Sequence, residues 1–457
     1  MTSAKAPPSF GCLTNAWAVL AVPILAFVLL LPVVTLSEPA GVQDAEDHPR
    51  PIYSSDPNDP WNSIFYCLFS RRIEYVVSDE YPEGAPFANL FPDSDRRVST
   101  RTFNRYEVGD RAIDPLYPNF FNDTGALVVL RDPTYSLFAK ALQRALDSDV
   151  PRSAMARAVM QSDLWSAYDS LCGEYRRPED YEVEQHRRVL ENLIGRLMRK
   201  IALTRGEIRS LPANYSAASE TLPVPDIFDP NSGWIEVVWL PHRMHDQAAG
   251  YRRVTRVFLK PTRPPHNVQK FLNSQRNRED DPVADLDGLA LVMQLLLIDS
   301  DGNPEVTNLT TDVQARLFAR VGPGAIEHAN ILACEISRRR LLSDPASGGL
   351  VPEADDSPVF LPMAGNDYTF ASRQTMKDGP PVQVHLRTRC ALCHGEDLRQ
   401  VMTFSFKMPP HFRVPPVKRL DPQGHEAADF VISEAKKRRD FNSLRPYFTA
   451  AVRRSDP

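Results

Sequence analysis

Residues 254–259 (VTRVFL) and 289–298 (LALVMQLLLI) are the stretches that decide the fold. The first is rich in β-branched and aromatic residues, as is the run at residues 234–239 (WIEVVW) before it, and this composition favours strands. The second is a continuous apolar run that ends in the turn-forming sequence DSDGN at residues 299–303. We therefore expect a β-rich domain over residues 223–375.

Helical spacing is the main pattern in the preceding part of the chain. Two amphipathic runs open at Pro133-Thr134 and at Pro151. In a third run, apolar residues recur every three or four positions, at Val189, Leu190, Leu193, Ile194, Leu197, Met198 and Ile201. Stripes of this kind are typical of core packing. The sequence predicts a mainly helical domain over residues 61–222, and hence an α+β fold for the chain.

The composition is that of an ordinary globular protein. The chain has 457 residues, of which 42% are hydrophobic and 24% are charged, and 41 prolines stand against only 20 glycines. These values exclude wholesale disorder, and the length predicts two or three domains. The net charge of −5 argues against a generic nucleic-acid-binding protein, which would carry a basic excess. We expect no nucleic-acid partner.

The N-terminal segment predicts export. Residues 16–34 are apolar and uncharged, with Lys5 before them and acidic residues from Glu38 onward. This order favours a cytoplasmic N-terminus and export of everything downstream. Residues 1–37 are therefore a cleaved signal peptide or a retained signal anchor, and residues 38–60 are an acidic, proline-rich linker. The rest is expected in the periplasm, either soluble or tethered to the inner membrane by residues 16–34.

One motif carries recognisable chemistry. Cys390, Cys393 and His394 form a C-x-x-C-H pattern, for which chance predicts roughly 0.002 matches in a chain of this composition. Two thiols at this spacing can form thioethers to the two haem vinyl groups, and the following imidazole can ligate the iron. Covalent haem attachment of this type fits an exported protein.

The motif resembles that of bacterial c-type cytochromes. The resemblance implies one covalently bound haem c, with thioethers at Cys390 and Cys393, proximal ligation by His394, and electron transfer with a redox partner. Residues 382–389 (VQVHLRTR) alternate like a strand, where the common cytochrome domain has a helix. We therefore expect a short haem-binding C-terminal region, residues 376–457, that is not a standard cytochrome c domain. The whole chain resembles large exported bacterial proteins that end in one such motif, which implies location and haem but no reaction.

The sixth iron ligand has several candidates. Met408 and a histidine are the two leading candidates for the distal ligand. Met408 precedes two prolines, as distal methionines often do, and Met402 also follows the motif. The nitrogen alternatives are His385, His411 and His425. An open sixth position would instead favour a peroxidase-like haem enzyme. A further alternative is a structural or interaction protein in which Cys390 and Cys393 form a disulfide or belong to a zinc site.

Other residues give weaker signals. Cys67 and Cys172 could form a disulfide or stay reduced, and both alternatives stay open. Cys334 lies in an apolar run and is expected to be buried. We interpret His242 and His245 as solvated loop residues and the basic residues 436–439 as a solvated helix face. The acidic residues 299–303 fit an Asp-Gly turn better than a calcium loop.

Overall fold

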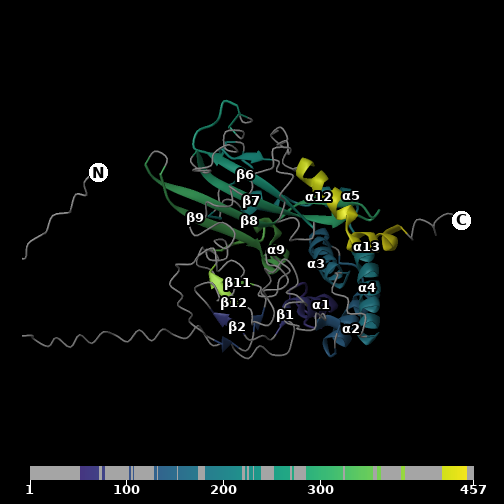
Figure 1. Ribbon diagram of the computed structural model, residues 1–457. Coiled ribbons are helices and arrows are strands. Elements are labelled where there is room, and N and C mark those ends of the chain that lie inside the picture. Colours follow the sequence, from purple (N-terminus) through teal and green to yellow (C-terminus); the bar gives the residue numbers. More distant parts are fainter. Residues whose placement is uncertain are drawn as a thin grey trace, which may run out of the picture. The chain divides into compact units, whose positions relative to one another are not determined.

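The largest element of the computed structural model is a six-stranded antiparallel sheet (Figure 1). Each strand is hydrogen-bonded to the next along the chain, so that the sheet is a simple meander. Its strands are β5 (Ile235–Val237), β6 (Arg253–Pro261), β7 (Leu286–Ile298), β8 (Pro304–Gly322), β9 (Ala325–Ile336) and β10 (Leu350–Glu353). The strand predicted at residues 254–259 is confirmed in β6, and the one predicted at residues 234–239 is confirmed for residues 235–237, as β5. The apolar run 289–298 lies in β7.

The structure describes most of the chain between residues 52 and 449. The described residues are 52–71, 128–172, 181–237, 252–271, 285–361 and 425–449, with gaps at 131, 152, 219–221, 224–225, 230, 268–269, 323–324 and 354–357, and the strand segments 75–77, 102–103, 106–107 and 382–385. Residues 49–457 form one compact unit. The domain boundaries predicted inside this unit stay predictions.

The helices confirm the α+β class. The three predicted runs are α2 (Thr134–Asp147), α3 (Ala154–Cys172) and α4 (Tyr181–Ile201). Most of the predicted stripe of α4 is buried, but Val189 is 43% exposed, so its assignment to the core was wrong. The other α-helices of the described residues are α1 (Pro60–Phe69), α5 (Arg205–Arg209), α6 (Asn214–Ala218), α9 (Arg338–Ser343), α12 (His425–Lys437) and α13 (Arg439–Thr449).

A β-bulge explains why residues 289–298 are apolar at nearly every position. The register between β7 and β8 shifts between Met293 and Leu296. Before the shift, Val292 packs into the hydrophobic cluster that also contains residues of α5 and α6. Beyond the shift, Leu295 and Leu297 pack into this same cluster. A bulge adds one residue, so the parity of the inward-facing positions changes. The alternate residues Leu296 and Ile298 pack into the second cluster, shared with α2–α4, and both faces of this strand end are therefore buried.

Helix α3 lies at the centre of the packing. Every residue from 158 to 168 is buried, and its two ends contribute to different hydrophobic clusters. The two aspartates of α3 are the buried Asp163 and the half-buried Asp169, and both need positive partners, because an unpaired buried charge costs several kcal/mol. Arg338 of α9 binds Asp163 with two hydrogen bonds, of 2.6 and 3.1 Å, and the Tyr53 hydroxyl donates a third of 2.5 Å.

The other aspartate of α3 joins three elements. Asp169 forms ion pairs with Arg252, which immediately precedes β6, and with Arg438, which lies between α12 and α13. Arg438 also donates to Asp440 of α13 at 3.0 Å, and the indole N–H of Trp165 donates to the other oxygen of Asp440 at 2.9 Å. These five residues form what we call the Asp169–Asp440 cluster. It contains two arginines and two aspartates and is formally neutral.

The C-terminal helices belong to the core of the fold. Helix α12 packs on β6 and β8, and α13 packs on α3 and α4 (Figure 1). Their buried residues join the same cluster as α2, α3 and α4, and they are Ala427, Ala428, Val431, Ala435, Phe441, Leu444 and Phe448. The last 33 residues therefore include two docked helices, of which the sequence predicted only a solvated helix face at residues 436–439.

A second, smaller sheet joins distant parts of the chain. Its order is β11 (Pro358–Leu361), β12 (Val382–His385), β2 (Tyr75–Val77) and β3 (Thr102–Phe103), and a separate pair joins β1 (Ser70–Arg71) to β4 (Tyr106–Glu107). Strand β12 pairs with β2 in parallel and with β11 in antiparallel fashion. The strand expected from the alternation of residues 382–389 is confirmed for residues 382–385.

The Asp169–Asp440 cluster predicts a large effect of one buried carboxylate. We expect Asp440→Ala to lower the free energy of unfolding by about 3 kcal/mol, because Asp440 is 1% exposed and its loss leaves the Trp165 N–H without an acceptor and Arg438 with Asp169 as its remaining carboxylate. Urea unfolding followed by tryptophan fluorescence measures this. Asp429→Ala, which removes an exposed carboxylate of α12, serves as the control and should change stability by less than about 0.5 kcal/mol. Equal effects of the two substitutions would contradict the role of the cluster.

Candidate functional site

The residues of the haem motif lie outside the described part of the chain. This holds for Cys390, Cys393, His394 and Met408, and also for Met402, His411, His242 and His245. Haem ligation by these residues therefore stays a prediction. The structure places only the backbones of the other two nitrogen candidates, since His385 is the last residue of β12 and His425 is the first of α12.

The elements on either side of the motif are both fixed in the fold. Strand β12 ends at His385, five positions before Cys390, and is hydrogen-bonded on both sides. Helix α12 begins at His425, 31 positions after His394, and buries its alanines and Val431. The segment that carries the motif therefore connects a paired strand to a packed helix.

The described cysteines are buried and reduced. Among them, Cys67, Cys172 and Cys334 form no disulfide, which decides against the Cys67–Cys172 bridge and confirms the burial expected for Cys334. Burial raises the pKa of the Cys172 thiol to about 12, and the nearby Glu191 carboxylate adds to the shift. Burial, with a contribution from Asp312, also raises the pKa of Cys334 to about 12. Both thiols are thus protonated at neutral pH and are poor nucleophiles.

Two further features of the described residues bear on function. Within the described ranges, no group of three or more His, Cys, Asp or Glu side chains is arranged to hold a metal ion. Nor does any helix in those ranges have the length and apolar character needed to cross a membrane. The predicted export segment, residues 16–34, lies outside them.

The turn at residues 299–303 and the basic residues 436–439 can now be placed. The Asp299 carboxylate accepts from the backbone N–H groups of Asp301 and Asn303 at 2.9 and 2.7 Å, and Gly302 adopts a φ of 83°, as expected for a turn. In the basic run, the lysines and Arg439 are exposed as predicted. The prediction was wrong for Arg438, which is half-buried and pairs with Asp169.

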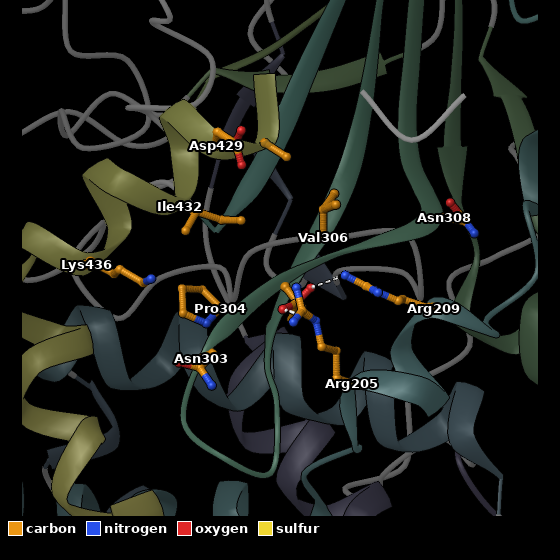
Figure 2. A pocket seen from close by; sticks show the side chains of 11 residues that line it. Arg205, Arg209, Asn303, Pro304, Val306, Asn308, Asp429, Ile432 and Lys436 are labelled. Carbon is orange, nitrogen blue, oxygen red and sulfur yellow. Dashed lines mark ion pairs between the residues drawn. The ribbon is translucent and has the colours of Figure 1, made fainter. Parts of the chain in front are cut away.

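A pocket of about 390 Å³ lies between α5, the start of β8 and α12 (Figure 2). Arg205 and Arg209 of α5 line one side, and Ile432 and Lys436 of α12 line the other, with Pro304 of β8 between them. The other lining residues are Asn303, Glu305, Val306, Asn308, Ala428 and Asp429. Sequence reasoning missed this pocket, because its charged residues come from three elements far apart in the chain.

The electrostatics of the pocket favour an anion. Both arginines pair with one carboxylate: Arg205 Nε lies 2.7 Å and Arg209 Nη2 lies 3.9 Å from the oxygens of Glu305. Glu305 is 14% exposed, whereas the two arginines are 58% and 54% exposed, so their remaining N–H groups are accessible. With Lys436 and Asp429, the lining carries three cations and two carboxylates.

A capping box fixes the helix that presents the two arginines. The Thr204 hydroxyl accepts from the Glu207 N–H at 3.2 Å, and the Glu207 carboxylate accepts from the Thr204 N–H at 2.8 Å. Arg157 of α3 forms an ion pair with the same carboxylate. The Thr204 backbone hydrogen bond, together with this arginine, lowers the pKa of Glu207. Helix α5 is thereby held against the body of the fold.

This geometry predicts a pH-dependent effect of Glu207→Gln. The pKa of Glu207 is lower in the folded protein than in the unfolded chain. Its carboxylate therefore stabilises the fold fully above the ordinary pKa of about 4.3, and this stabilisation is lost as the pH falls through the lower pKa of the folded state. We expect the substitution to lower the free energy of unfolding by about 0.5–1 kcal/mol at pH 7, since the partly exposed ion pair is screened. The difference from the wild type should disappear near pH 2. Urea unfolding at both pH values tests this, with Asp149→Asn as a matched exposed-carboxylate control. A difference that persists at the lower pH would contradict the role of the ionised carboxylate.

Comparison of the chain with protein-family models, with curated proteins and with solved structures gives no match. The function is therefore inferred from the chain's own residues and their geometry.

Proposed function

We propose that this protein is an exported, single-haem, c-type cytochrome-like protein that transfers electrons. The observation that carries the proposal is the C-x-x-C-H motif at Cys390, Cys393 and His394, in a chain whose apolar residues 16–34 predict export. The two cysteines would hold the haem by thioether bonds, and His394 would ligate its iron. When bound, the haem would supply one-electron redox chemistry.

The donor set of the motif fits this cofactor. It offers two thiols and one imidazole, and each has a role in covalent haem ligation. The three described cysteines are buried, and the raised pKa values of Cys172 and Cys334 make those thiols unreactive. Cys12 precedes the predicted export segment, so Cys390 and Cys393 would be the remaining two cysteines of the exported part.

The positions of β12 and α12 add support. A redox cofactor works best on a scaffold that holds its ligands in a fixed geometry. The haem-bearing segment follows a strand with partners on both sides and leads to a helix whose apolar residues are buried in the main core. The chain itself thus anchors both ends of this segment, and the protein would set the reduction potential through the axial ligands and their burial.

Covalent haem is tested with a pyridine haemochrome spectrum of denatured protein that has been exported beside a haem-attachment system. We expect a c-type band in the wild type and none in Cys390→Ala/Cys393→Ala, because thioether bonds survive denaturation. The matched control is Cys172→Ala/Cys334→Ala, which removes two buried thiols and should keep the band in whatever protein folds. Absence of the band in properly exported wild type would rule out the cytochrome assignment in favour of a disulfide or zinc site.

The sixth ligand separates electron transfer from enzyme chemistry. For electron transfer we expect a six-coordinate spectrum that modest cyanide leaves unchanged. Substitution of Met408 by Ala should then lower the reduction potential or open the site, because a methionine ligand raises the potential relative to a second histidine. Met402→Ala is the control and should leave the spectrum unchanged. A high-spin wild-type spectrum that responds to cyanide and peroxide would instead support the peroxidase-like alternative.

A further inference from the structure

We propose that the pocket between α5, β8 and α12 binds a small organic monocarboxylate, with its carboxylate between Lys436 and the two arginines and its apolar part against Val306 and Ile432. This is a second site, separate from the haem proposal, and it rests only on described residues.

The size and shape of the pocket fit a small ligand. Its volume of about 390 Å³ lies at the lower end of the range of ligand sites, which is roughly 300–1,000 Å³. The arginines and Lys436 approach it from opposite sides, as Figure 2 shows. A ligand placed between them would therefore contact α5 and α12 at the same time.

The charge of the pocket matches a monoanion. Three cations and two carboxylates leave one net positive charge. Arg205 uses its Nε atom for Glu305, so the two Nη groups of the guanidinium can bind a second carboxylate in the two-pronged geometry that arginine favours. Lys436 has no ion-pair partner among the described residues, whereas its neighbour Lys437 pairs with Glu434 at 2.5 Å.

Apolar side chains distinguish this pocket from a simple phosphate site. Pro304 and Ala428 are buried, and Val306 and Ile432 are half-buried. These four residues give one part of the pocket an apolar surface beside the charged groups. A short alkyl chain attached to a carboxylate would cover that surface, which inorganic phosphate cannot do.

Calorimetric titration of the full-length protein with acetate, butyrate and hexanoate at low salt tests the proposal. We expect saturable binding that tightens with chain length, by up to about fourfold for each methylene that becomes fully buried. Inorganic phosphate, the contrasting probe, should bind more weakly than hexanoate. Absence of saturable binding by hexanoate, or tighter binding of phosphate, would overturn the proposal.

Three variants localise the binding. Lys436→Met should weaken hexanoate binding about tenfold, whereas Lys437→Met, one position along the same helix, should leave it unchanged. Glu305→Gln should tighten binding, because it removes the carboxylate that competes for both arginines. Thermal unfolding shows that each variant is folded before titration. Equal effects of the two lysine substitutions, or weaker binding by Glu305→Gln, would overturn the assignment to this pocket.

Discussion

The pairing of two aspartates on a buried helix is the constraint on which the rest of the structure depends. Helix α3 has no exposed side along most of its length, and a carboxylate in such surroundings is tolerated only beside a positive partner. Asp163 obtains it from α9, and Asp169 obtains it from the residue before β6 and from the junction of α12 and α13. The start of β6, the helix after β9 and the C-terminal helices must therefore all meet α3 at defined points.

The sequence predicts the helices and strands that local periodicity determines. It does not predict the ion pairs and the pocket that form between residues far apart in the chain. The apolar spacing in residues 189–201 and the β-branched run in residues 254–259 fix a helix and a strand, and both are confirmed. The apolar residues of α12 also recur at helical spacing. The basic residues that follow them, however, favoured a solvated helix face over a helix packed in the core. Arg438 looks like its exposed neighbours because its partner, Asp169, lies 269 positions earlier. Similarly, Cys390–His394 is recognisable from spacing alone, whereas the pocket forms only when α5, β8 and α12 come together.

Helix α12 links the two proposed functions. Ala427 and Val431 are buried in the core, whereas Asp429, Ile432 and Lys436 line the pocket, so different residues of one helix serve stability and binding. The same helix receives the chain that comes from the haem motif. The Asp169–Asp440 cluster holds its far end against α3 and the start of β6. Damage to this cluster would therefore disturb both the anchoring of the haem segment and one wall of the pocket.

The most direct test of the central claim is the intact mass of the exported protein, followed by peptide mapping. Covalent haem adds a fixed mass that survives denaturation, and it identifies the peptide that carries it. The account predicts one haem per chain, found on the peptide that contains Cys390, Cys393 and His394. An unmodified mass in protein exported beside a working haem-attachment system would contradict it, and so would a haem on any other peptide.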